Sequence, residues 1–455
     1  MLDDTIIAVS TPLGYGGLGV VRLSGSRSLP IAKKIFKPRN RSRKISSHRP
    51  VLGNLSNFEN KELFEEAFLT FFSKPLTYTR EDMVEISCHG SPVILEEVVR
   101  LGVQAGARHA NPGEFTLRAY LNGRIDILQA EAINDIITAS SLKQAKISFR
   151  QLEGRLSRTV ASLRSQIIHL LSNIEASIEF PEEGLRISPK TTDQILTRSR
   201  EILKKLISSY DLGKMLSEGV SLVIAGRTNV GKSTLFNALL EKNRAIVTPY
   251  PGTTRDYLQE QIKINDSVFT LTDMAGIDVP LHPVEKEGIK RGKELASSSD
   301  GILLVLDASR KESDEDLKLL RKYKAKRSLL LFNKIDLPVK MNIQKIKKRA
   351  IGRPTLDISA LKGTHLDELK KMIVKNFIPT KEDSEEVILH LRQKLLFEEI
   401  LSCLIQAHRL LKDGHSEEIY VEEIQKTIPL IGQLTGEIQK DEIIEEIFNR
   451  FCVGK

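Results

Sequence analysis

The 455-residue sequence has no tryptophan, three cysteines and no long hydrophobic run. The cysteines, Cys88, Cys403 and Cys452, are odd in number and far apart, which argues against a disulfide framework and is typical of reduced thiols in a cytoplasm. No apolar run approaches the ~18 residues that a membrane span requires. The acidic start, with Asp3 and Asp4, does not resemble a secretory signal. We therefore expect a cytoplasmic protein that is not inserted in a membrane.

The composition is that of ordinary globular domains, with 40% hydrophobic and 28% charged residues. The length predicts two or three domains. Charge is distributed unevenly: residues 214–378 carry 30 basic and 20 acidic side chains, whereas residues 379–455 carry 9 and 16. The basic excess of the middle segment could meet RNA or serve phosphate chemistry.

Hydrophobic periodicity divides the chain into four parts. Residues 1–120 contain short β-rich runs and predict an α+β domain. Residues 121–213 repeat apolar side chains every three or four positions, including one predicted helix from about Leu152 to Ile178. Residues 214–378 alternate strands and helices, and residues 379–455 are helical again. The economical architecture is an α/β domain inserted into an all-α helical domain and preceded by the α+β domain.

A glycine-rich motif follows the first strand of the predicted α/β domain. Gly226 to Ser233 read G-x-x-x-x-G-K-S between the apolar strand 221–225 and a helical pattern, as a P-loop requires. Backbone N–H groups of such a loop surround phosphates, Lys232 reaches the β- and γ-phosphates, and Ser233 offers its hydroxyl to Mg²⁺. The expected contacts are Asn229, Val230, Gly231, Lys232, Ser233 and Thr234.

Two further motifs follow in the order typical of a GTPase. Asp273, Met274, Ala275 and Gly276 form D-x-x-G, where the carboxylate can hold Mg²⁺ through water. Asn333, Lys334 and Asp336 form N-K-x-D. The Asp336 carboxylate can accept both N1–H and the exocyclic amine of guanine, a pair that adenine lacks. Ser359 and Ala360 are expected to support the base.

The segment between the P-loop and D-x-x-G indicates how hydrolysis proceeds. Gly252 to Asp256 read G-T-T-R-D, and a threonine hydroxyl there can complete the Mg²⁺ shell. The residue after D-x-x-G is Ile277, so a Ras-type glutamine is lacking at that place. The polar group that orients water must lie elsewhere. Glu285 and Glu287 are candidates by spacing alone.

These motifs, together with those of the flanks, resemble the MnmE (TrmE) family of tRNA modification GTPases. The resemblance covers essentially the whole chain. The flanking motifs that carry it are Asp4–Ala8, Gly19–Gly25, Tyr78–Asp82, Cys88–Gly90, Pro112–Thr116, Leu121–Asp126, Gln129–Ala132, Phe180–Glu183 and the terminal Phe451–Lys455.

The resemblance implies a set of ligand-binding residues. The N-terminal domain would bind a formyl- or methylene-tetrahydrofolate through Arg22, Glu81, Arg124 and Lys455. Mg²⁺ would be held by Ser233 and Thr254, and Glu285 would orient the attacking water. The ligands implied for K⁺ are Asn229, Thr248, Tyr250 and Thr253, in a nucleotide-binding segment that also includes Pro251 and Gly252.

The resemblance also implies partners and a substrate. A homodimer would act with the FAD-containing flavoprotein MnmG (GidA) to modify position 5 of the wobble uridine of certain tRNAs, by carboxymethylaminomethyl or aminomethyl addition. The alternative is an Era-like, RNA-binding GTPase switch in ribosome assembly. Such proteins usually append a basic RNA-binding module, whereas residues 379–455 sum to −7.

Several residues carry two interpretations. Cys452 is either a thiol that takes part in uridine chemistry or a structural residue. The lysine-rich stretch from Lys340 to Arg349 contacts tRNA or forms a solvated helix face. Cys88 and His89 form too small a set for a metal site. Arg124 and Met274 depart from the residues common in the family, Lys and Thr.

Overall fold

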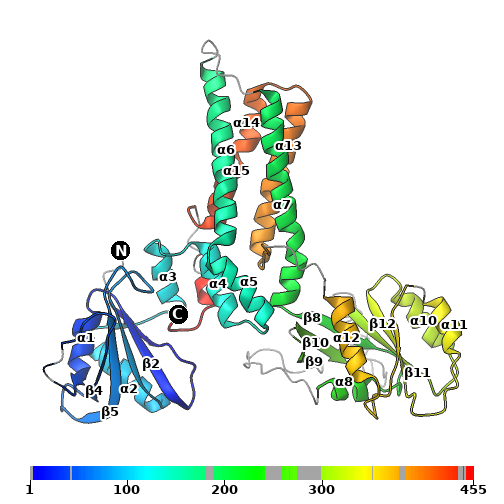
Figure 1. Cartoon of the computed structure of the whole chain (residues 1–455), viewed down its shortest axis with the longest axis horizontal. Helices are drawn as coiled ribbons and strands as arrows, with labels where there is room; N and C mark the ends of the chain where they lie inside the picture. Colours follow the sequence, from blue (N-terminus) through cyan, green and yellow to red (C-terminus); the bar gives the residue numbers. More distant parts are fainter. Residues whose placement is uncertain are drawn as a thin grey trace, which may run out of the picture. The chain divides into compact units, whose positions relative to one another are not determined.

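The computed structural model (Figure 1) describes residues 4–40, 42, 44–180, 188–240, 259–265, 267–273, 299–350, 352–378, 386–438, 444 and 447–455. The chain divides into two compact units, and each unit is built from segments that are not contiguous in the sequence. The first comprises residues 1–137, 148–200 and 399–455, and the second residues 138–147 and 201–398. No helix among the described residues is long and apolar enough to cross a membrane.

The first unit begins with a seven-stranded sheet in the order β3-β4-β5-β6-β2-β1-β7. Helices α1 and α2 pack on this sheet, and their apolar faces join its strands in one core. This is the α+β domain expected from residues 1–120. The elements are β1 Ile6–Val9, β2 Gly16–Ser24, α1 Ser28–Ile35, β3 Phe36–Pro38, β4 Pro50–Ser56, β5 Leu63–Phe72, β6 Met83–Gly90, α2 Pro92–Gln104, β7 Arg108–His109 and α3 Glu114–Leu121.

Helices make up the rest of the first unit. Helices α14 and α15 pack against α6 although they follow it by more than 230 residues. Ser177 on α6 donates to Glu417 Oε2 of α14 at 2.8 Å. The helices are α4 Ile127–Ile137, α5 Leu142–Leu152, α6 Arg155–Glu179, α7 Pro189–Ser217, α13 Leu391–Lys412, α14 Glu417–Gln425 and α15 Thr427–Thr435, of which α5, α7 and α13 continue into the second unit.

The prediction of one helix from Leu152 to Ile178 was wrong at its start. Leu152 ends α5, and α6 begins at Arg155. Gly154 separates them with φ = 78°, a left-handed conformation that an uninterrupted α-helix excludes. The remainder of the prediction is confirmed, because the apolar side chains from Leu156 to Ile174 are buried along α6.

The second unit is built on a six-stranded sheet in the order β13-β12-β11-β8-β10-β9. Every pair is parallel except β9 with β10. The seven residues of β11 are all buried, as expected for a central parallel strand covered on both faces. The elements are β8 Val220–Ala225, α8 Lys232–Leu240, β9 Gln259–Ile264, β10 Ser267–Asp273, β11 Gly301–Asp307, α10 Asp314–Lys322, β12 Ser328–Asn333, α11 Ile343–Arg349, β13 Thr355–Asp357 and α12 Leu366–Phe377.

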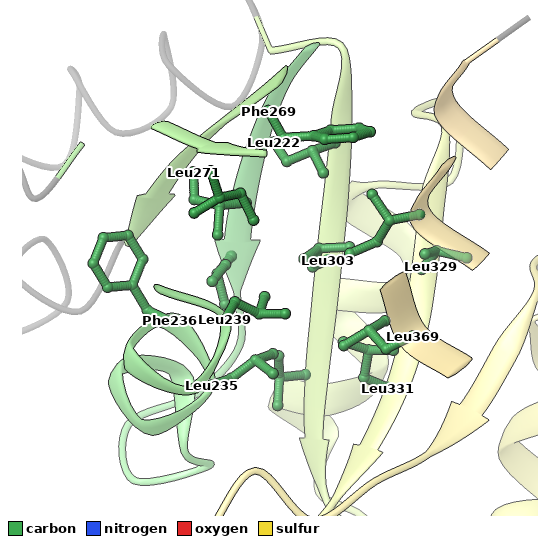
Figure 2. Close-up of a cluster of buried hydrophobic side chains, with 14 of the residues drawn as sticks. Leu222, Leu235, Phe236, Leu239, Phe269, Leu271, Leu303, Leu329, Leu331 and Leu369 are labelled. Carbon is green, nitrogen blue, oxygen red and sulfur yellow. The ribbon is translucent and has the colours of Figure 1, made fainter. Parts of the chain in front are cut away.

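Alternate side chains of these strands form the core on one face of the sheet (Figure 2). Leu222, Leu303 and Leu331 point to helices α8 and α12, which contribute Leu235, Leu239 and Leu369. Other side chains of the same strands, such as Val223 and Leu304, pack on the opposite face. The packing fixes the carboxyl ends of β8, β10, β11 and β12 along one edge. The expected fold class is confirmed: an α/β P-loop domain, an all-α region and a preceding α+β domain.

Candidate functional site

The predicted nucleotide-binding motifs meet at the carboxyl edge of the α/β sheet. The P-loop follows β8, Asp273 ends β10, and Asn333 ends β12. Ligands of open α/β folds bind at this edge, because loops and helix N-termini converge there. Motifs separated by more than 100 residues in the sequence therefore lie within hydrogen-bonding distance of one another.

The P-loop holds its lysine and glycine in defined positions. Lys232 is buried, and its Nζ donates to the carbonyl oxygens of Gly226 and Arg227 at 2.8 and 2.9 Å. Gly231 has φ = 97°, and a Cβ at this position would lie 2.3 Å from Nδ2 of Asn333. Only glycine fits this position, because both the backbone angle and the neighbouring side chain exclude a larger residue.

Two of the predicted Mg²⁺-binding groups are in contact. The Ser233 hydroxyl donates to Asp273 Oδ2 at 2.7 Å, joining the start of α8 to the end of β10. A hydroxyl and a carboxylate side by side are the hard oxygen donors that Mg²⁺ prefers. The pair fits a Mg²⁺ ion bound directly by Ser233 and through water by Asp273.

The guanine-specificity motif forms a network with the P-loop. Asn333 Nδ2 donates to the carbonyl of Val230 at 2.9 Å, and Asn333 Oδ1 accepts from the Ala360 N–H at 2.9 Å. The Ser359 hydroxyl donates to Asp336 Oδ1 at 2.6 Å. This bond orients the carboxylate that would accept the two N–H groups of guanine.

Lys334 contacts Asp307, a residue that the sequence analysis did not identify as part of the site. Its Nζ donates to the carbonyl of Asn229 at 2.6 Å and to Asp307 Oδ2 at 2.7 Å. Although burial alone would raise the pKa of Asp307, the hydrogen bonds from Lys334 and Ser309 hold that pKa below its ordinary value. Asp307 thus anchors the lysine as a charged pair. Its position at the end of the apolar run 301–306 was the available signal.

Asn229 and Lys334 both have left-handed backbones, with φ of 63° and 69°. Non-glycine residues in this region are uncommon and are held there by their surroundings, often at functional sites. Here the bond from Lys334 Nζ to the Asn229 carbonyl joins the two strained positions. The rest of the predicted hydrolytic machinery, Thr248, Tyr250, Pro251, Gly252, Thr253, Thr254, Met274, Ala275, Gly276 and Glu285, lies outside the described residues.

A second set of predicted residues lies beside a cavity in the N-terminal domain. The cavity, of about 630 Å³, is lined by Tyr78, Glu85 and Arg124 among others. The guanidinium of Arg124 lies 4.7 Å from the centre of the Tyr78 ring. Arg22 lies 5.5 Å from the same ring and is bonded to Glu85, with Nη2 2.7 Å from Oε1. Arginine, carboxylate and an aromatic face together suit a flat heterocycle with an acidic tail.

Arg22 retains a donor that the described residues do not satisfy. Its Nη1 is buried and has no hydrogen-bond partner in the described part of the chain. Buried donors in proteins are nearly always bonded, so an orphaned guanidinium nitrogen indicates a place for a ligand acceptor. On this observation the residues present fit an anionic folate.

The structure places Glu81 apart from Arg22. Glu81 accepts from the Ser24 hydroxyl at 2.7 Å and from the buried Arg118 at 3.2 Å. The carboxylate that faces Arg22 is that of Glu85, which sequence reasoning missed. Arg22 and Glu85 are directly opposite in the antiparallel pair β2–β6. Strand register was not readable from the sequence, so the pairing of Glu85 with Arg22 was not anticipated, and the folate contact that the family resemblance implies for Glu81 stays a prediction.

The C-terminal residues dock on the N-terminal domain. The Gly113 N–H donates to the Cys452 carbonyl at 3.4 Å, and the Phe115 N–H donates to the Lys455 carbonyl at 3.2 Å. The Ser10 hydroxyl donates to the Gly454 carbonyl at 3.1 Å. Burial, followed by the positive charge of Arg22, lowers the pKa of the Lys455 ammonium, with Glu85 opposing. Lys455 therefore lies in the same electrostatic environment as the folate candidates.

The cysteines and histidines do not assemble a metal site in the described part of the chain, where no group of three or more metal-ligating side chains occurs. His89 Nδ1 instead lies 2.8 Å from Glu65 Oε1. Burial raises the pKa of the Cys88 thiol to about 11, so that it stays protonated. Cys452 is exposed.

Comparison with known proteins covers the whole chain. Residues 5–124 match the model of the GTP-binding protein TrmE N-terminus, and residues 127–452 match that of the MnmE helical domain. Curated relatives named tRNA modification GTPase MnmE are similar over their full lengths. That of Acetivibrio thermocellus is 37% identical over 100% of this chain and 99% of its own. That of Aquifex aeolicus is 38% identical over 100% of both chains.

Solved structures match part of the chain. A crystal structure of Aquifex aeolicus Era bound to GDP and AlF4⁻ is 30% identical over 43% of this chain and 68% of its own, with a TM-score of 0.30. The G domain of the Thermotoga maritima FeoB iron transporter is 28% identical over 34% of this chain and 98% of its own, with a TM-score of 0.28.

Proposed function

The chain belongs to the MnmE family of tRNA modification GTPases, and on that premise we propose that it is a K⁺-dependent GTP hydrolase that modifies position 5 of the tRNA wobble uridine. The reaction would use a one-carbon tetrahydrofolate and a flavoprotein partner that carries FAD. The observation that carries the GTPase assignment is the shared edge at which Lys232, the Ser233–Asp273 pair and Asp336 converge.

The chain's own residues supply binding and orientation for hydrolysis. Lys232 and the P-loop N–H groups hold the β- and γ-phosphates, and Asp336, oriented by Ser359, selects guanine. Mg²⁺ held by Ser233, Asp273 and Thr254 would neutralise phosphate charge. K⁺ held by Asn229, Thr248, Tyr250 and Thr253 would place positive charge where it develops in the transition state. Glu285 is the proposed group that orients the water.

The N-terminal cavity is the proposed folate site. Arg22, Glu81 and Arg124 are the proposed contacts, and Lys455 adds a cation from the docked C-terminus. Glu85 pairs with Arg22, and Tyr78 supplies an aromatic face beside Arg124. We also propose that this domain forms the homodimer. Leu13 and Tyr15 are 87% and 92% exposed. Exposure of large apolar side chains to water is unfavourable, and burial in a dimer interface would remove that cost.

The ribosome-assembly alternative has less support. It rests on the likeness to Era alone, whereas both flanking domains match the tRNA modification family. Nucleoside analysis of tRNA from a deletion strain tests the choice. Loss of the wobble-uridine modification, together with co-purification of the flavoprotein, supports the proposal. Normal tRNA with immature ribosomes would reject it.

Potassium dependence is expected from the P-loop asparagine and from Ile277, which stands where a catalytic glutamine would be. Hydrolysis should be faster in KCl than in NaCl, because oxygen ligands spaced for K⁺ fit Na⁺ poorly. Asn229→Ala should remove the difference while GTP still binds, and Glu285→Ala should lower turnover in both salts. Equal rates of the unaltered protein in the two salts would contradict the K⁺ site.

Arg22→Ala should weaken folate binding at least tenfold, because a charge-assisted hydrogen bond contributes about 1.5–3 kcal/mol. Calorimetry with 5-formyl-tetrahydrofolate measures the loss, and GTP hydrolysis should persist. Arg39→Ala is the matched control, since Arg39 is 70% exposed and pairs only with Glu66 among the described residues. Comparing Glu85→Gln with Glu81→Gln separates the two glutamates. A larger loss in Glu81→Gln would support the contact that the family resemblance implies for Glu81, and a larger loss in Glu85→Gln would assign that contact to Glu85.

A further inference from the structure

A second cavity, of about 870 Å³, lies at the opposite edge of the GTPase sheet from the P-loop. Ser328, the first residue of β12, and Pro354, directly before β13, both line it. The nucleotide-binding residues instead follow the carboxyl ends of the strands. Since β12 has six residues, its two ends are separated by roughly 17 Å. The cavity is therefore distinct from the GTP site.

The cavity is strongly basic. Its described lining residues include no carboxylate and six cationic side chains, from the end of α10, the loop before β12, and the end of α11 with the segment that follows it. These are Arg321, Lys324, Lys326, Arg327, Arg349 and Arg353. Six of the basic side chains of residues 214–378 thus line one cavity. Such clustering focuses positive potential and attracts anions.

Three of these six cations are not neutralised by other described residues of the protein. Within the described part of the chain, Arg321, Lys324 and Arg349 form no ion pair, and all three are exposed. Lysines elsewhere on α11 behave differently: Lys345 pairs with Glu312 at 2.8 Å and Lys347 with Asp357 at 3.5 Å. Unpaired like charges on one surface repel one another, a cost that an anionic partner relieves.

Two residues that line the cavity carry buried polar atoms with no hydrogen-bond partner among the described residues. Ser328 is 6% exposed, and its hydroxyl is one of these atoms. Arg353 Nη1 is likewise buried and unsatisfied, although Nη2 donates to the Leu320 carbonyl at 3.0 Å. Buried polar groups are normally bonded. Two unsatisfied donors beneath a basic rim therefore match an oxygen-rich anion.

The lining favours a nucleic-acid backbone over a small molecule. No aromatic side chain occurs among the described lining residues, so a base would have no ring on which to stack. The charge is spread over six side chains, more than one phosphate requires. We propose that this basic cavity binds the phosphate backbone of RNA, and its identification as the tRNA substrate rests on the proposed function.

Two double variants of the full chain test the proposal. Arg321→Ala with Lys324→Ala removes two exposed cations of the cavity. Lys318→Ala with Lys322→Ala removes the same charge from α10, close in sequence to the first pair, at positions that do not line the cavity. Binding of unmodified tRNA is measured by fluorescence anisotropy across a salt series. Buried Ser328 and Arg353 are left unchanged, which avoids destabilising the fold.

The cavity variant should bind tRNA severalfold more weakly, and the slope of log affinity against log salt should fall by about 1.5, as two lost phosphate contacts predict. The control variant should keep both values, and both variants should hydrolyse GTP normally, which confirms folding. Equal effects of the two variants, or unchanged affinity of the cavity variant, would overturn the proposal. Inorganic pyrophosphate that bound the cavity as tightly as tRNA would also overturn the backbone assignment. Unaltered protein that binds tRNA through the cavity without modifying it would instead reject the proposed function.

Discussion

Asp336→Asn is expected to change the base that the site recognises from guanine to xanthine. The affinity for xanthosine triphosphate relative to that for GTP should rise roughly 10⁴-fold. The carboxylate accepts two N–H groups of guanine, whereas an asparagine amide presents one acceptor and one donor. Xanthine offers N1–H and a carbonyl oxygen, which match that pair. The Ser359 hydroxyl, 2.6 Å from Asp336 Oδ1, can donate to the amide oxygen as well and keeps the side chain in place.

Nucleotide titrations with GTP and xanthosine triphosphate measure this exchange. Asp307→Asn is a useful comparison, because Asp307 contacts Lys334 rather than the predicted base position. It should weaken both nucleotides without changing their order. Unchanged GTP affinity in the Asp336 variant would remove guanine selection from this residue.

Deletion of Cys452–Lys455 should abolish tRNA modification while GTP hydrolysis continues. These four residues contact the N-terminal domain through the Gly113, Phe115 and Ser10 hydrogen bonds, and none of these contacts involves a GTP motif. The deletion removes the Lys455 cation from the environment of Arg22. Folate binding should therefore fall together with modification, and tRNA nucleoside analysis and calorimetry measure the two losses.

Two substitutions in the full-length chain, Gly454→Ala and Cys452→Ser, test how the C-terminus acts. Gly454 has φ = 96°, and a Cβ there would lie 2.1 Å from the Val9 carbonyl oxygen, so Gly454→Ala should displace the docked segment. Val453→Ala is the control, since Val453 is 52% exposed. Cys452→Ser separates thiol chemistry from positioning, because retained modification would leave only a structural role. Full activity of the Gly454 variant would show that docking is dispensable.

Local pattern was sufficient for the strands of the α/β domain and for its GTP motifs. The apolar runs near residues 221, 268, 301 and 328 each form a buried strand with parallel neighbours, as expected for short apolar segments of a sheet covered on both faces. The P-loop and the guanine motif adjoin the ends of those strands. Their chemistry depends on short spacings along the chain, which a sequence displays directly.

Features that depend on contacts between distant segments were decided by tertiary structure alone. That Glu85 is the partner of Arg22 follows from strand register, which places the two residues directly opposite each other in the antiparallel pair β2–β6. The docking of Gly454 on Ser10 joins residues 444 positions apart. The basic cavity gathers cations from three segments that show no common motif. Composition, spacing and periodicity thus determined the domain types and the GTP motifs, whereas packing of remote segments determined which charges became neighbours, since electrostatic and hydrogen-bond partners are selected by distance in space.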